Sequence, residues 1–131
     1  MDGWDFDVWL GRWTCTDAAE GSVGTNTVSR VLGGQVIEET FHITDASGTA
    51  LNGRSFTVLD PVRGWCQTWV DDQGSYLDFT GGLGPEGMVL ARPGQRMVFR
   101  DVTSTGFTWD WEKRDGDVWQ LAWRLLYSRA D

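Results

Sequence analysis

The chain has 131 residues, which suits one domain with a single core and is too short for two domains of ordinary size, so we expect residues 1–131 to form a single domain. Its 19 acidic and 11 basic residues give a formal net charge of -8 with no cluster of Lys and Arg, and we expect no nucleic acid partner. No stretch approaches the roughly 20 apolar residues that cross a bilayer, and the acidic start of the chain differs from a secretory signal, so we expect a cytoplasmic protein with no membrane partner.

Cysteine and tryptophan narrow the chemistry further. Cys15 and Cys66 are too few for a disulfide framework and form no metal-binding pair, so we expect reduced thiols and no metal site, with a bridge between the two left open. The chain has nine Trp residues. Because indole combines a large apolar area with an N–H group that needs a partner when buried, these residues either fill a core or line a pocket.

In chain order, residues 4–10 come first. They carry Phe6, Trp9 and Leu10 at near-helical spacing, which predicts a short helix or 3₁₀ turn that plugs one end of the fold. Short runs follow in which Val, Thr, Phe and Trp alternate with polar residues, and this period of two predicts an all-β protein. We expect about ten strands, at residues 12–17, 22–32, 35–43, 50–60, 64–71, 75–81, 87–92, 95–102, 106–114 and 117–128.

The connections between these runs favour consecutive antiparallel pairing. Gly33-Gly34, Asp72-Gln73-Gly74, Pro93-Gly94 and Asp115-Gly116 are typical of hairpin turns, whereas parallel pairing needs crossovers of a dozen or more residues. An up-and-down barrel is favoured over an open sheet because closure removes exposed edges. The glycine-rich residues 81–87 lack the spacing of a phosphate loop, and we expect a mobile loop at the barrel mouth there.

One motif at the start of the predicted barrel resembles a known family. In Phe6-Asp7-Val8-Trp9-Leu10-Gly11-Arg12-Trp13, the Gly-x-Trp that opens the first strand after an aromatic turn is similar to the start of lipocalins and related calycins. The resemblance implies that Trp13 closes the base of the barrel. It also implies that an Arg of the last strand packs across that indole as a cation over a ring face, either Arg129 or Arg124.

A closer likeness extends over nearly the whole chain. It is carried by residues 6–13, by Gly-Trp-Cys-Gln-Thr-Trp-Val-Asp at 64–71, and by a C-terminal set: Phe107, Thr108, Trp109, Glu112, Asp115, Gly116, Trp119, Trp123, Tyr127 and Arg129. These residues resemble a bacterial family of lipocalin-like β-barrel domains with no assigned activity, which implies the fold and leaves the chemistry open. Classical secreted lipocalins carry a signal peptide and disulfides; we expect neither here, and this departure counts against an export or carrier role.

Alternation along the strands predicts which aromatic residues face inward. Each of the runs 64–71, 106–114 and 117–128 has one face rich in aromatic side chains, and we expect that face to be interior. The predicted pocket for a small apolar molecule is lined by Trp65, Gln67, Trp69, Trp109, Trp111, Trp119, Trp123 and Tyr127. The alternative is that these rings fill the barrel solidly.

Two further residues are candidates for chemistry, Glu39 and His42. Alternation places Glu39 on the apolar face, where a buried carboxylate pairs with a cation or has a raised pKa suited to acid–base work, with Arg54, Arg100 and Arg124 as expected partners. His42, the single histidine, falls on the opposite face; it is a candidate haem ligand or general base, or else a surface histidine. The ligand-binding candidates therefore also include Glu39 and Arg54.

Four functions stay open from the sequence. The first is binding of a small hydrophobic or aromatic molecule in a Trp-lined cavity, without a cofactor, by a monomer or homodimer. The second is a cofactor-independent cyclase, isomerase or hydrolase that uses Glu39 or His42 for proton transfer in that cavity. The third is haem binding through His42. The fourth is a solid-core interaction domain without a cavity.

Overall fold

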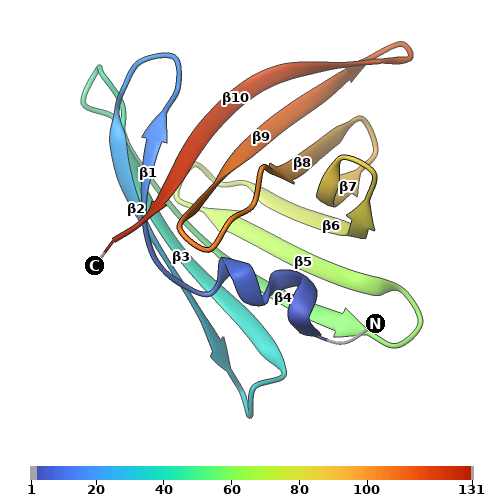
Figure 1. Ribbon diagram of the computed structural model, residues 1–131. Helices are drawn as coiled ribbons and strands as arrows, with labels where there is room; N and C mark the ends of the chain where they lie inside the picture. Colours follow the sequence, from blue (N-terminus) through green and yellow to red (C-terminus); the bar gives the residue numbers. More distant parts are fainter. Residues whose placement is uncertain (1–2, 131) are drawn as a thin grey trace.

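The computed structural model describes residues 3–130 of the chain. One 3₁₀ helix, η1 (Gly3–Trp9), precedes ten strands. The strands are β1 (Gly11–Asp17), β2 (Val23–Val31), β3 (Val36–Thr44), β4 (Ala50–Asp60), β5 (Gly64–Asp71), β6 (Tyr76–Gly84), β7 (Gly87–Arg92), β8 (Gln95–Arg100), β9 (Gly106–Asp115) and β10 (Val118–Arg129). Each strand pairs antiparallel with its neighbour in sequence, and β10 returns to β1, so the sheet closes (Figure 1). Among these residues, no helix has the length and apolar character needed to cross a membrane.

The predicted all-β class, the number of strands and their up-and-down order are confirmed. Alternation was informative because the barrel has one interior, so a strand that turns polar side chains outward must turn its alternate residues inward. The prediction of a loop over residues 81–87 is wrong. β6 continues to Gly84 and pairs with β7, and the turn lies at the end of the barrel that η1 closes.

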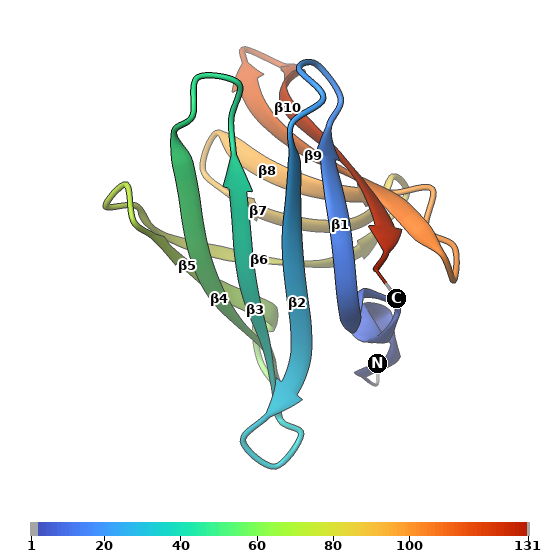
Figure 2. The same cartoon turned by 90° about the vertical axis from the view of Figure 1, so that its left-hand side faces the viewer.

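The two ends of the barrel differ. η1 and both ends of the described chain lie at one end, and the β1–β2, β3–β4 and β9–β10 connections lie at the other (Figure 2). Phe6 and Trp9 of η1 are buried, and the Phe6 ring meets Trp65 and Phe99 edge-on at centroid distances of 4.8 and 5.6 Å. The predicted plug is thus present, and we refer to its end as the closed end and to the other as the open end.

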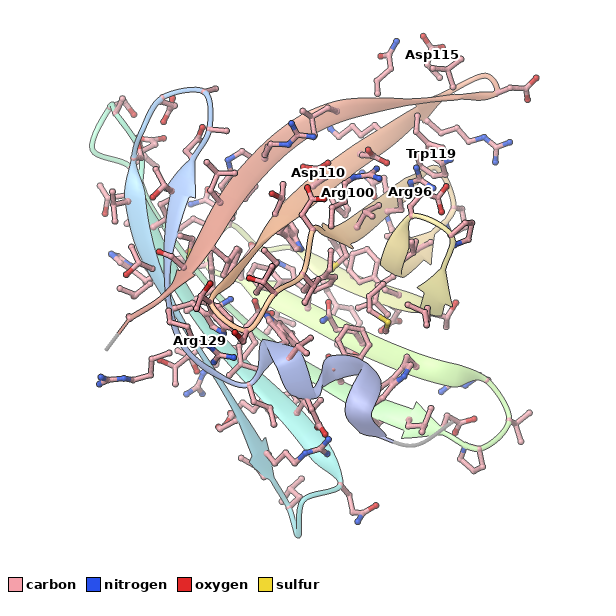
Figure 3. The ribbon with its side chains drawn as sticks, viewed as in Figure 1. Arg96, Arg100, Asp110, Asp115, Trp119 and Arg129 are labelled. Atoms are coloured by element: carbon pink, nitrogen blue, oxygen red, sulfur yellow. The ribbon has the colours of Figure 1, made fainter. Side chains whose placement is uncertain are left out.

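A tryptophan and an arginine fasten η1 to the barrel. The Trp13 Nε1–H donates to the Trp9 carbonyl oxygen at 2.7 Å, and the Arg129 guanidinium carbon lies 4.0 Å from the centroid of the Trp13 ring. Arg129 also donates to the carbonyl oxygens of Leu10 and Val8 (Figure 3). This is the contact that the resemblance to lipocalins implies, and Arg129 rather than Arg124 makes it.

Gly11 makes room for this contact. Its φ of +130° lies where side chains are rarely tolerated, and a Cβ there would lie 2.2 Å from Arg129 Nη1. The glycine of the Gly-x-Trp motif therefore has a steric reason in this chain. It lets the guanidinium reach across the strand onto the indole ring.

An ion-pair cluster covers the outer face of β8, β9 and β10. Asp110 is fully buried and accepts hydrogen bonds from Arg100 Nε at 2.9 Å and from Arg124 Nε and Nη2 at 2.7 and 2.8 Å. Glu112 accepts from Arg96 Nε at 2.6 Å and from Arg100 Nη2 at 3.0 Å. Arg96, Arg100 and Asp110 of this cluster are labelled in Figure 3. Because the inner faces of these strands carry Trp109 and Trp111, the cluster stabilises the wall from which these indoles project.

Candidate functional site

The interior of the barrel holds a cavity of about 390 Å³. It reaches from Trp9 and Tyr127 on the floor to the β5–β6 and β7–β8 connections at the open end. Its lining is Trp9, Glu39, Phe41, Leu51, Gln67, Trp69, Asp71, Ser75, Leu77, Phe79, Arg92, Gln95, Met97, Trp109, Trp111, Trp123, Leu125 and Tyr127. The interior is therefore not filled solidly by its aromatic side chains, and the cavity falls in the volume range of small-molecule sites.

Four indoles form the upper wall of the cavity. Trp109 and Trp111 from β9 are parallel, with centroids 6.5 Å apart, and Trp123 from β10 meets Trp109 edge-on at 5.7 Å. Phe41 on β3 bridges to Trp123 at 6.2 Å and to Trp69 on β5 at 6.0 Å. The rings thus surround the space from several strands, an arrangement suited to a flat or bulky apolar molecule.

Carboxylates hold two of these indoles in position. Trp69 Nε1 donates to Asp71 Oδ2 at 2.8 Å, and Trp123 Nε1 donates to Asp17 Oδ2 at 2.7 Å. Burial alone would raise the pKa of both aspartates, but these indole bonds and backbone N–H donors outweigh it and hold each pKa below its ordinary value. Both carboxylates therefore stay ionised near neutral pH and fix the ring orientations.

The floor of the barrel is polar on the β2–β5 side. The inward residues Asn26, Glu39, Ser55, Thr57 and Gln67 form what we call the polar belt, and each of them is buried. Ser55 Oγ donates to Glu39 Oε1 at 2.7 Å, and Asn26 Nδ2 donates to Glu39 Oε2, also at 2.7 Å. Gln67 Nε2 donates to Thr57 Oγ1 at 3.1 Å. Glu39 and Gln67 are the members of the belt that line the cavity.

Burial determines the electrostatics of this floor. Removal from water raises the pKa of the Glu39 carboxyl above its ordinary value, and the bonds from Ser55 and Asn26 offset part of that rise. Tyr127 accepts a hydrogen bond from Asn26 Nδ2 at 2.9 Å, and burial raises its pKa as well. Burial raises the pKa of Cys15 to about 12, so this thiol is unreactive.

The polar belt has more acceptors than donors. Within residues 3–130, the buried atoms Asn26 Oδ1 and Gln67 Oε1 have no hydrogen-bond partner. A buried acceptor without a partner costs free energy, so a bound molecule that brings a donor to it removes that cost. Gln67 is the more informative of the two because it lines the cavity.

The rim of the open end is mostly acidic. A second recess lies beside the cavity mouth, shares Leu51 and Trp123 with it, and is lined by Asp17, Glu20 and Asp45. One cation lies among the cavity-lining residues, Arg92, which donates to Gln95 Oε1. Across the described residues, no group of three or more His, Cys, Asp or Glu side chains is placed to hold a metal ion.

The structure brings together most of the residues predicted for the site. The cavity lining includes Glu39, Gln67, Trp69, Trp109, Trp111, Trp123 and Tyr127. Trp65 also faces the interior, but it packs against Phe6 at the closed end and is not part of the lining.

The prediction for Trp119 is wrong. A β-bulge between Leu121 and Trp123 shifts the register of β10 against β9, so residues before it turn to the other face. Trp119 therefore lies outside the barrel, with the Arg96 and Arg114 guanidinium carbons 4.4 and 5.8 Å from its ring centroid (Figure 3).

Arg54 and the expected cationic partners of Glu39 are also corrected. Arg54 is exposed on the outer face of β4, where it pairs with Val70, and Arg100 and Arg124 bind Asp110 on the outside of the barrel. Glu39 is therefore paired with neutral groups rather than with an arginine. Alternation correctly predicted that Glu39 points inward. Its hydrogen-bond partners were not predicted, because they lie on β2 and β4, whose inward residues are polar.

His42 lies on the outer face of β3, as alternation predicted. Its Nδ1 atom is 2.6 Å from Asn52 Oδ1, and the side chain is exposed. The imidazole points away from the cavity, so it does not contact a molecule bound inside the barrel. Both Cys15 and Cys66 are free thiols.

Sequence reasoning missed several residues that shape the site. Asn26, Ser55 and Thr57 lie on strands in which both faces carry small or polar residues, so alternation did not show which face was inward. In β4 the large apolar residue Phe56 lies on the exposed outer face, so apolar character does not mark the interior of this strand. Asp17 and Asp71, which accept the hydrogen bonds of Trp123 and Trp69, lie at the ends of predicted strands, and nothing in the sequence showed these bonds. No protein-family model matches the chain, and no curated protein matches it significantly.

Proposed function

We propose that this barrel binds a small apolar or aromatic molecule in its Trp-lined cavity. The observation that carries the proposal is a cavity of about 390 Å³ with four indoles on its wall and a small number of polar groups on its floor. Small-molecule sites combine a mostly apolar lining with a few placed polar groups in this way. A solid-core interaction domain would not contain a cavity of this size.

The proposal includes a lipocalin-like relationship for the fold. Two observations support it: the closed antiparallel barrel of ten strands, and the Arg129 guanidinium stacked on Trp13 beside a plugged end. Because one fold hosts many functions, the relationship supports ligand binding in the cavity and does not identify the ligand.

The hydrogen bonds of Glu39 favour binding over proton transfer. Both carboxyl oxygens already accept a bond from a neighbour, Oε1 from Ser55 and Oε2 from Asn26. A general base needs a lone pair directed at the proton that it abstracts. The bonds from Ser55 and Asn26 hold the Glu39 side chain in one orientation and lower its basicity, while a lone pair on each oxygen stays available to a ligand donor. His42 on the outer face does not reach the cavity.

A titration with N-phenyl-1-naphthylamine tests the proposed function. This neutral aromatic probe fluoresces strongly in apolar surroundings, and we expect saturable enhancement with a stoichiometry of one. Trp109→Ala removes a ring from the middle of the aromatic wall and should weaken probe binding about five- to tenfold, the worth of one or two aromatic contacts.

The matched control is Trp119→Ala, which removes the same side chain from the outer face of the neighbouring strand. It should leave the probe affinity unchanged. Absence of saturable binding, or equal weakening by both variants, would count against the cavity as the binding site.

A further inference from the structure

The floor of the cavity presents hydrogen-bond acceptors to the interior, and one of them belongs to an acidic side chain, Glu39. Glu39 lies there with its only described hydrogen-bond donors, Ser55 and Asn26, both neutral. Gln67 also lines the cavity, and only 3 % of its surface is exposed. Within the described chain, its Oε1 atom has no hydrogen-bond partner. A bound molecule that brings a donor to this floor would complete the hydrogen bonding of the belt.

The aromatic wall adds a second preference of the same sign. Indole faces carry negative electrostatic potential and attract cations, most strongly where water is excluded. Trp69, Trp109, Trp111 and Trp123 all line the space above Glu39 and Gln67. A carboxylate-bearing molecule would meet these faces and the Glu39 carboxyl with like potential.

The entrance is acidic too. Asp17, Glu20 and Asp45 line the recess beside the mouth, Asp71 lies in the mouth itself, and the whole chain carries a net charge of -8. Charge of one sign around an opening raises the local concentration of molecules with the opposite sign. Arg92 is the opposing charge at the mouth, and Gln95 Oε1 already accepts a hydrogen bond from it.

We propose that the molecule held in this cavity is an amine that is protonated at neutral pH, with its ammonium group against Glu39 and Gln67 and its apolar body between the indoles. This inference rests on the proposed function. It adds the charge and polarity of the ligand, which the apolar lining alone does not determine. The ammonium supplies a cation beside Glu39, which would favour the ionised carboxylate despite its burial, and it supplies the donor that Gln67 Oε1 lacks.

Three matched probes test the inference by isothermal titration calorimetry at neutral pH: 3-phenylpropylamine, 3-phenylpropan-1-ol and 3-phenylpropanoate. They share a phenyl ring and linker and differ in the terminal group, which is cationic, neutral or anionic. We expect the amine to bind at least about tenfold more tightly than the alcohol, as a desolvated cation over aromatic faces and beside a carboxylate should, and the carboxylate to bind weakest.

Two isosteric variants locate the origin of the preference. Glu39→Gln should reduce the ratio of amine to alcohol affinity to about one, because it removes the acidic group of the cavity floor while keeping the shape of the side chain. Glu38→Gln makes the same change in net charge on the adjacent residue of β3, which faces outward, and should leave the ratio unchanged. Near-UV circular dichroism checks that each variant is folded. If Glu39→Gln does not fold, the comparison of the three probes on the wild type still tests the inference.

The outcomes separate this inference from the proposed function. If the alcohol or the carboxylate binds as tightly as the amine, the cavity still binds small molecules and the inference about charge is overturned. A preference for the amine that survives Glu39→Gln in a folded variant also overturns it. If none of the three probes binds, both the inference and the proposed function fail.

Discussion

Asp110→Asn should destabilise the barrel by about 2 kcal/mol. The buried carboxylate accepts three hydrogen bonds from Arg100 and Arg124, and the amide keeps the shape but loses the charge. A hydrogen bond to a charged group contributes about 1 kcal/mol more than a neutral one, which gives about 3 kcal/mol for three bonds. Water offsets part of this loss, because the Arg124 side chain is 41 % exposed and that of Arg100 is 28 % exposed.

Urea unfolding followed by Trp fluorescence at pH 7 measures this change, and the same loss lowers Tm by about 5–8 °C. The matched control is Asp115→Asn at the exposed β9–β10 hairpin, which alters the net charge equally and should change stability by less than about 0.5 kcal/mol (Figure 3). A folded Asp110→Asn protein as stable as the wild type would refute the reasoning.

The pH dependence of the same pair provides a second check. Despite its burial, the hydrogen bonds and charges of Arg124 and Arg100 lower the pKa of Asp110 below its ordinary value of 3.8. Stability from a lowered pKa is present above the ordinary value and is lost as pH falls through the folded one. The wild type and Asp110→Asn should therefore converge in stability as pH falls from 3.8 through the folded pKa of Asp110.

Three further changes test other parts of the structure. Arg129→Met removes the cation over Trp13 and the hydrogen bonds to the carbonyl groups of η1, so the free energy of unfolding should fall by about 1–2 kcal/mol. Amide hydrogen exchange in η1 should become faster, and unchanged exchange would contradict the role of Arg129 in holding η1 on the barrel. Because burial raises the pKa of Glu39, the wild type loses stability as pH rises from the ordinary value of 4.5 through the folded one. Glu39→Gln should therefore gain stability relative to the wild type as pH rises above 4.5; thermal unfolding at increasing pH should show the trend, and parallel curves would oppose it. In Gly53→Ala the new Cβ would lie 2.1 Å from the Trp69 ring, which must shift into the cavity space, so N-phenyl-1-naphthylamine should bind several-fold more weakly to a protein with unchanged far-UV circular dichroism.

The sequence was sufficient for the architecture because turns and alternation act locally. Hairpin glycines and short alternating runs recur through the chain, and each predicts its own strand without reference to the rest. The aromatic face with Trp109 and Trp111 was assigned correctly, because its opposite face carries Asp110 and Glu112 and the contrast is strong.

The errors arose where a face depends on distant residues. The bulge before Trp123 reverses the faces of residues 118–121, the first third of β10. Apolar residues occur on both faces of that strand, so the sequence pattern does not reveal the reversal. Asn26 and Ser55 became visible as parts of one polar belt only when β2, β3 and β4 were placed side by side. A cavity is likewise a property of the closed barrel, since alternation tells which side chains point inward and not whether they meet.

The indole N–H signals of the ¹⁵N-labelled protein test the central claim, that a small apolar molecule enters this cavity. On titration with N-phenyl-1-naphthylamine, we expect saturable shifts at the lining residues Trp9, Trp69, Trp109, Trp111 and Trp123. The signals of Trp13, Trp65 and Trp119, which lie outside the lining, should stay in place. Shifts concentrated at Trp119, or no saturable shift at the lining indoles, would contradict the account.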